Sequence, residues 1–170
     1  MKRTIFLSLI FLSVFAVRGS ATDVSNKEIK TTGLITSLVV NSNVTVVLVT
    51  HPSEKLRMMG DQQFLEEISI KQTDGKLIID GNRRRNFKNR GVIYVPANHL
   101  QQIKINNAAY VHTASTLRIP KLKIIVNGDC KVNLATLGKI DFVENEHYEV
   151  RYEVREKNNL ESAVVKSRQY

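Results

Sequence analysis

The densest cluster of charged side chains lies between residues 83 and 90. This segment reads Arg-Arg-Arg-Asn-Phe-Lys-Asn-Arg, with five basic residues and no acidic one. Guanidinium groups bind sulfate, phosphate and carboxylate groups through paired hydrogen bonds, and an aromatic ring can stack on a sugar. The segment therefore predicts an anion-binding loop; the alternative is a mobile, solubilising loop. The candidate ligand-binding residues are Arg83, Arg84, Arg85, Phe87, Lys88 and Arg90.

The other reactive side chains do not form a recognisable catalytic or metal-binding pattern. No two of the four histidines are three or four residues apart, which is the usual spacing of a metal pair. They are His51, His99, His112 and His147. Cys130 has no histidine partner in the sequence, and no Gly-x-Ser-x-Gly motif is present. We therefore predict no catalytic residue, no metal site and no cofactor, and we expect a protein that is not an enzyme.

Short segments with the composition of β-strands must position the candidate residues named above. Runs rich in β-branched residues, such as 44–49 and 92–95, are separated by turn-forming residues. Asp74-Gly75 predicts a hairpin turn, and only 61–68 suggests a helical turn. Few segments have a period of 3.6 residues, so the sequence predicts an all-β fold.

A repeat with an offset of 21 residues relates two of these runs. Residues 103–111 align with 124–132, apolar to apolar and Asn106 to Asn127, and residues 40–46 repeat the pattern in part. This period favours a β-solenoid of stacked coils over two ordinary hairpin turns. Asparagine suits the corners because it tolerates left-handed backbone and can stack into hydrogen-bonded ladders. The predicted corner residues are Asn41, Asn106, Asn107, Asn127 and Gly128.

The first 21 residues are typical of a secretory signal peptide. Two basic residues precede a 14-residue apolar stretch, which ends at Arg18-Gly19-Ser20-Ala21. We expect cleavage before Thr22, with cleavage after Ala16 or an uncleaved anchor as alternatives. The mature chain would keep 22 basic and 16 acidic residues. It would have no transmembrane anchor, and export predicts a periplasmic, cell-surface or secreted protein.

The remaining chain divides into three parts. Residues 22–32 are polar and are expected to be a flexible lead-in, and 33–156 form a single domain. Residues 148–155 alternate apolar and charged side chains, which predicts a C-terminal capping strand. Residues 157–170 are expected to be a tail, although 163–165 could add a short strand. The single cysteine, Cys130, is expected to be buried.

The order and spacing of these motifs resemble the putative auto-transporter adhesin head GIN domain family over about residues 33–134. The resemblance rests on 38–49, 56–61, 75–79, 92–111 and 127–129. It implies a right-handed β-helix in an exported protein of Gram-negative bacteria, without enzyme activity. The chain departs from the family at the first corner, where Asn106-Asn107-Ala108-Ala109 replaces a Gly-Ser-Gly type sequence. It is also short for the family.

Two functions follow as hypotheses. The first is an exported, non-enzymatic domain that binds an acidic glycan or another cell-surface or envelope component through the basic loop. The alternative is a structural or assembly protein that contacts a partner protein, or a second copy of itself, by strand addition. Export argues against nucleic acid as the natural ligand.

Overall fold

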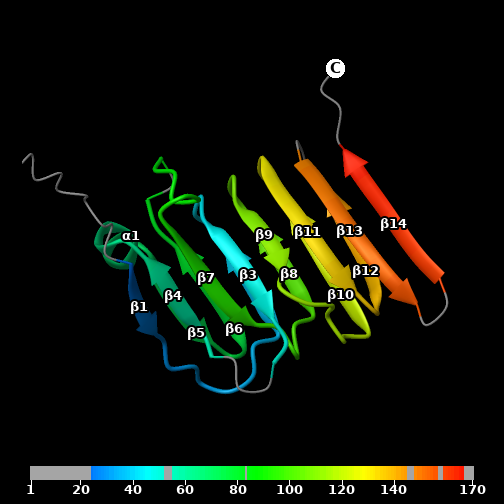
Figure 1. Ribbon diagram of the computed structural model, residues 1–170, viewed down its shortest axis with the longest axis horizontal. Coiled ribbons are helices and arrows are strands. Elements are labelled where there is room, and N and C mark those ends of the chain that lie inside the picture. Colours follow the sequence, from blue (N-terminus) through cyan, green and yellow to red (C-terminus); the bar gives the residue numbers. More distant parts are fainter. Residues whose placement is uncertain (1–23, 52–54, 83, 145–147, 157–158, 167–170) are drawn as a thin grey trace, which may run out of the picture.

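The computed structural model describes residues 24–51, 55–82, 84–144, 148–156 and 159–166 (Figure 1). Within these residues the chain forms fourteen strands in two sheets and a single helix. The all-β prediction is therefore confirmed. The predicted signal peptide, residues 1–21, lies outside the described residues.

The two sheets, named A and B, contain eight and six strands. In spatial order, sheet A consists of β1 (Ser25–Glu28), β4 (Arg57–Gly60), β7 (Gly91–Pro96), β3 (Thr45–Val49), β9 (Tyr110–Thr113), β11 (Cys130–Thr136), β13 (Tyr148–Glu156) and β14 (Asn159–Lys166). Sheet B consists of β12 (Lys139–Glu144), β10 (Lys121–Val126), β8 (Gln102–Ile105), β2 (Ser37–Val40), β6 (Lys76–Asp80) and β5 (Ser69–Thr73). The helix α1 (Gln62–Glu67) joins β4 to β5.

Most strands stack as two-strand units, each with one strand in sheet B and the next strand of the chain in sheet A. The units β6–β7, β2–β3, β8–β9, β10–β11 and β12–β13 lie side by side, with parallel pairing between neighbours. The 21-residue repeat corresponds to the pairing of β8–β9 with β10–β11, in which each residue pairs with the one 21 positions later. Ile103 pairs with Ile124 in sheet B, and Val111 pairs with Val132 in sheet A.

The order of the units along the stack differs from their order in the chain. The unit that comes first in the chain, β2–β3, lies in the middle, with β6–β7 on one side and β8–β9 on the other (Figure 1). The segment between β3 and β6 supplies β4, α1 and β5, which extend both sheets by antiparallel pairing. The 21-residue period of the sequence did not predict this order of the units, because the repeat relates only β8–β9 and β10–β11.

The core lies between the two sheets. Alternate residues of strands such as β6, β8, β10 and β11 point inward, and stacked aliphatic side chains fill the space. Leu77, Leu38, Ile103 and Ile124 form one such row across sheet B, all fully buried. Burying an aliphatic side chain of this size contributes about 1.5–3 kcal/mol to stability. Hydrophobic burial along the rows therefore holds the units together.

Two local predictions are confirmed by the backbone. Asp74 and Gly75 both have positive φ, 49° and 73°, as the tight hairpin between β5 and β6 requires. The helical turn predicted over 61–68 is α1. Asp61 caps it, since its side chain accepts a hydrogen bond from the backbone N–H of Phe64.

The two ends of the domain differ from the sequence prediction. The lead-in, predicted to be flexible over 22–32, contains β1, which pairs antiparallel with β4. The predicted capping strand is β13, but it runs parallel to β11 and is not the last strand. The tail predicted over 157–170 contains β14, antiparallel to β13. The pairing of β1 depends on a distant partner, so a local pattern did not predict it, whereas β14 pairs with the strand just before it and includes the short strand considered over 163–165.

Candidate functional site

The basic loop, residues 81–90, connects β6 to β7. It lies where the chain passes from sheet B to sheet A, beside the turn between β2 and β3. Asn86 bridges to Asn43 of that corner, and the Phe87 N–H donates to the Asn43 carbonyl at 2.9 Å. The Thr45 hydroxyl donates to the Lys88 carbonyl at 3.0 Å. The loop backbone is thus fixed to the neighbouring unit over 86–88, while Arg83 lies outside the described residues.

Phe87 does not face solvent, in contrast to its predicted role in stacking on a ligand. Its side chain is fully buried and packs edge-on against Phe64 of α1, with ring centroids 6.2 Å apart. Burial of an aromatic ring stabilises the fold more than an exposed position of the same ring would. Phe87 therefore anchors the loop to the core, and its ring is not available to a ligand.

Two arginines of the loop are bound to the α1 region. The Arg90 Nε donates to Oδ2 of Asp61 at 2.6 Å, and its Nη1 donates to Gln63. Arg85 forms an ion pair with Glu67. Arg85 and Arg90, which were both predicted to bind a ligand, thus already have carboxylate partners within the chain. These pairs were missed from the sequence because the acidic residues lie 18 and 29 residues upstream.

Arg90 also changes the chemistry of its partner. The hydrogen bond from Arg90, together with the one from the Phe64 N–H, holds the pKa of the Asp61 carboxyl below its usual value. Asp61 is therefore charged at neutral pH and keeps both its cap and its ion pair. Of the predicted anion-binding residues, the exposed Arg84 and the half-buried Lys88 form no ion pair with a described acidic residue.

The predicted corner asparagines lie in one column beside this loop. Asn106 donates to Asn41 at 2.8 Å, and Asn127 donates to Asn106 at 2.7 Å. Asn107 donates to the Asn41 carbonyl at 3.3 Å. Gly128 lies directly against Asn107, and a Cβ at position 128 would come within 3.0 Å of the Asn107 Cα. These residues have a structural use that explains their identities without a ligand.

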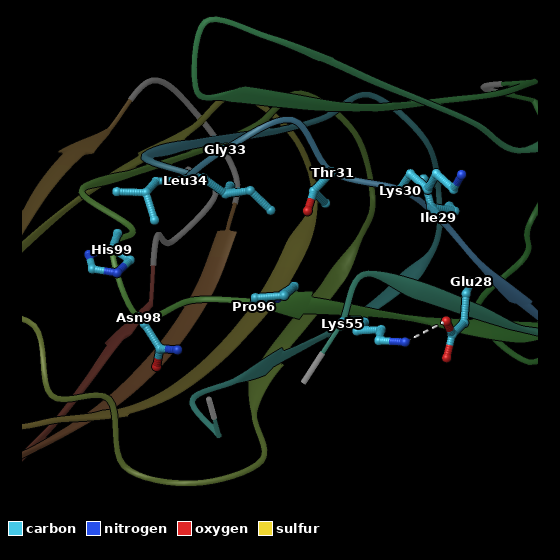
Figure 2. A pocket seen from close by; sticks show the side chains of 11 residues that line it. Glu28, Ile29, Lys30, Thr31, Gly33, Leu34, Lys55, Pro96, Asn98 and His99 are labelled. Atoms are coloured by element: carbon cyan, nitrogen blue, oxygen red, sulfur yellow. Dashed lines mark hydrogen bonds and ion pairs between the residues drawn. The ribbon is translucent and has the colours of Figure 1, made fainter. Parts of the chain in front are cut away.

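A shallow pocket of 730 Å³ lies at the opposite edge of the stack, between β1, the segment that follows it and the loop between β7 and β8 (Figure 2). Glu28 is the one carboxylate in its lining, and it forms an ion pair with Lys55 at 3.0 Å. Figure 2 shows this pair at one end of the pocket and His99 at the other. An acid and a base that are separated in this way do not form a general acid–base pair.

Tyr94, Tyr110 and His112 lie on the outer face of sheet A. Arg57 lies over the Tyr94 ring, with its Cζ 4.5 Å from the centroid. Tyr110 stacks on His112 with centroids 4.9 Å apart, and the Lys131 Nζ lies 5.9 Å from the Tyr110 centroid. The Tyr94 and Tyr110 rings thus each have a neighbour in the chain. The cluster stabilises the sheet surface through cation–π and stacking contacts.

No catalytic or metal-binding constellation is seen in the described part of the chain. No group of three or more His, Cys, Asp or Glu side chains is placed to hold a metal ion there. Cys130 is buried, as predicted, and burial raises the pKa of its thiol to about 12. It is therefore a neutral core residue at physiological pH rather than a nucleophile.

The comparisons with known proteins decide the family. A family model described as "Putative auto-transporter adhesin, head GIN domain" matches residues 35–148. The chain belongs to this family. The resemblance seen in the sequence is confirmed, and the match includes β12, beyond the predicted limit at about residue 134. No match was found among curated proteins.

Two solved structures of putative adhesins are similar to this head GIN domain. A putative adhesin from Parabacteroides merdae is 18% identical with a TM-score of 0.56; the match covers 70% of this chain and 51% of that protein. A putative adhesin from Bacteroides fragilis is 18% identical with a TM-score of 0.50, covering 77% of this chain and 68% of that protein. The GIN domain chain thus spans about half the length of the Parabacteroides protein. At this identity the likeness shows the fold.

The family and these structures are named as adhesins and not as enzymes. In the part of the chain that the structure describes, no helix has the length and apolar character needed to cross a membrane.

Proposed function

We propose that this chain is an exported, non-enzymatic adhesin-like domain that binds an anionic component of a cell surface or envelope, most simply an acidic glycan. Membership of the head GIN domain family supports the adhesin-like role and export. The apolar stretch that ends at Gly19-Ser20-Ala21 supports export independently. In this reading the mature chain begins near Thr22.

We further propose that the scaffold is a right-handed β-solenoid. Neighbouring two-strand units pair in parallel register in both sheets, and the asparagine column follows the same stacking. A strand that crosses to another layer and returns parallel beside its starting point does so in the right-handed sense in nearly all proteins. The connection from β8 through β9 to β10 is of this kind.

The observation that carries the binding function is the anchored basic loop. Phe87 in the core and the bonds to Asn43 and Thr45 fix the backbone on both sides of Lys88. A fixed cation binds an anion with less loss of conformational entropy than a mobile one. Arg84 and Lys88, with Arg83, are the loop residues that we assign to the ligand. Arg85 and Arg90 instead hold the loop against the α1 region.

An array of anionic and neutral glycans, probed at low and at physiological salt, tests this function. The purified chain is compared with a variant carrying Arg84→Gln and Lys88→Gln, and with a second variant carrying Lys27→Gln and Lys30→Gln, which removes the same charge elsewhere. Signal on acidic glycans that persists at physiological salt supports the proposal. A chain that binds no acidic glycan at either salt concentration contradicts it.

A second candidate is assembly by strand addition. Sheet B ends at β12, whereas sheet A continues with β13 and β14, and among the described strands β12 pairs only with β10. Val143 on this strand is 40% exposed. A free strand edge can pair with a strand of another chain. Sedimentation velocity over a range of concentrations tests this; self-association that Val143→Lys abolishes would favour it over glycan binding.

A further inference from the structure

The outer face of sheet B concentrates lysine side chains that lie far apart in the sequence. Outward and inward residues alternate on each strand, and the inward ones form the core. Five of the six strands present at least one outward lysine. This lysine face consists of Lys71, Lys76, Lys104, Lys121, Lys123 and Lys139.

Few acidic residues balance this charge. The sequences of β5, β2, β8 and β10 contain no aspartate or glutamate. Asp141 pairs with Lys121 at 2.5 Å, and Asp80 accepts a hydrogen bond from the Gly81 N–H. Within the described residues, the other five lysines of the face have no acidic partner.

Protection of sheet edges does not explain the lysine face. Lysines on edge strands discourage pairing with other chains, which accounts for Lys71 on β5 and Lys139 on β12. Lys104 and Lys123, however, lie on β8 and β10, which have neighbours on both sides. The two lysines are diagonal neighbours in the register, within reach of each other's long side chains, so their like charges do not favour the pairing of β8 with β10. Their presence in the interior therefore calls for another reason.

The strand register places the lysines in two rows that cross the sheet. One row is Lys71–Ile78–Val39–Lys104–Ile125–Val143, and the next is Thr73–Lys76–Ser37–Gln102–Lys123–Asp141, whose terminal Asp141 is the carboxylate that pairs with Lys121. In each row the two lysines are three strands apart, which corresponds to about 14 Å at the usual strand spacing. The rows are offset by one strand. The cations thus form a staggered array along the direction in which the units stack.

We propose that the lysine face binds a linear polysaccharide that carries carboxylate or sulfate groups, with the polymer lying across the strands. The inference rests on the proposed function and adds sheet B as a second binding surface, beyond the basic loop, for a long polymer. A polyanion that crosses the strands meets cations on β5, β6, β8 and β10 in turn. Each contact is weak on an exposed surface, and several on one rigid sheet add up.

The surface between the lysines favours a polymer over a membrane as the ligand. A protein face that inserts into a bilayer exposes aromatic and aliphatic side chains among its basic residues. Val39, at the centre of the first row, is only 7% exposed, and Phe142, the aromatic residue of β12, packs against the core. Val143 at the end of the row is the one large aliphatic residue of the face that exceeds a third exposure.

Binding of heparin and polygalacturonate to the purified chain, measured by titration calorimetry, tests the inference. Neutral dextran is the control polymer. The face variant carries Lys76→Gln, Lys104→Gln and Lys123→Gln. The matched variant carries Lys27→Gln, Lys30→Gln and Lys131→Gln, three exposed lysines outside sheet B that give the same net charge. The loop variant carries Arg84→Gln and Lys88→Gln. Circular dichroism confirms that each variant folds.

We expect the face variant to bind roughly tenfold to hundredfold more weakly than the parent chain. The slope of log affinity against log salt should also fall by roughly two to three. The matched variant should remain within about threefold of the parent, and the loop variant should lose less affinity than the face variant.

Other outcomes would overturn the inference, and they separate it from the proposed function. If the parent chain binds neither polymer, both fail. If it binds but only the loop variant is weakened, the lysine face is wrong and the proposed function stands. Equal losses in the face and matched variants would show an effect of net charge alone. Binding to phosphatidylcholine vesicles that contain phosphatidylglycerol, without binding to the polymers, would assign the face to a lipid surface.

Discussion

Asn106 donates a hydrogen bond to Asn41 at 2.8 Å, although 65 residues separate the two in the chain. Asn106 also accepts from Asn127, so one side chain joins three units of the stack. All three asparagines are partly buried, where unmade hydrogen bonds are more costly than at a fully exposed site. The column is therefore a specific link between units whose apolar rows are otherwise interchangeable.

The first prediction concerns this link. Asn106→Ala removes both ladder bonds, and each net hydrogen bond contributes about 0.5–1.5 kcal/mol, so the free energy of unfolding should fall by about 1–3 kcal/mol. Urea denaturation followed by circular dichroism measures it. Asn133→Ala, at an exposed position on β11, is the control and should stay within about 0.5 kcal/mol of the parent chain. Equal effects of the two substitutions would show that the ladder adds no stability.

Phe87 gives the second prediction. Phe87→Ala leaves a cavity against Phe64 and should lower the free energy of unfolding by about 3–5 kcal/mol. Arg84→Ala, three residues away on the exposed part of the same loop, should change it by less than about 0.5 kcal/mol. The same denaturation experiment measures both. A Phe87→Ala variant as stable as the parent would mean that the ring is not an anchor.

The third prediction is a pH dependence. The pKa of Asp61 is lowered in the folded state from its ordinary value of 3.8, so the unfolded chain binds the proton more readily. The stability from Asp61 is therefore complete above about pH 4 and is lost as the pH falls through the lowered folded pKa. Asp61→Asn should be less stable than the parent chain at neutral pH, and this difference should shrink in acid.

The denaturation midpoint, measured from neutral pH down through the ordinary range of aspartate, checks this prediction. Asp74→Asn, in the exposed hairpin turn, serves as the control carboxyl. A gap between parent and Asp61→Asn that stays constant with pH would show that the charge of Asp61 does not contribute.

The fourth prediction concerns Cys130. Burial raises the pKa of the thiol from 9.0 to about 12, so the native thiol should react with a disulfide reagent at pH 8 only through unfolding. In urea the same thiol should react at once. Because only the unfolded chain ionises this thiol between pH 9 and 12, stability should also fall across that range. Cys130→Ala should abolish that part of the fall, and rapid labelling of the folded chain would contradict the buried position.

The parts of the fold that depend on local chemistry were predictable from the sequence. Asp74-Gly75 specified a hairpin because both positions need positive φ, and the repeat of 103–111 in 124–132 specified parallel register. The partner of β1 was not predictable, because β1 pairs with β4, which lies elsewhere in the chain. The pairing of β14 is local, with the preceding strand β13, but the sequence indicated a strand there only over 163–165.

The candidate site was only partly predictable for the same reason. The basic residues of 83–90 stand out in the sequence, but the carboxylates that bind Arg85 and Arg90 belong to a helical turn upstream. The lysine face was missed because its residues are spread over five strands and meet only through strand register. The alternation in Lys121-Leu122-Lys123-Ile124 was the one local sign of an outward basic row.

The central place of β2–β3 has a consequence for the newly made chain (Figure 1). This unit leaves the ribosome first, yet its neighbours on one side are supplied by 76–96 and on the other by 102–113. Until residue 113 has emerged, these very apolar strands lack a pairing partner on at least one side. Nascent chains in this interval are those most prone to pair with one another, so the need for chaperone protection is greatest then.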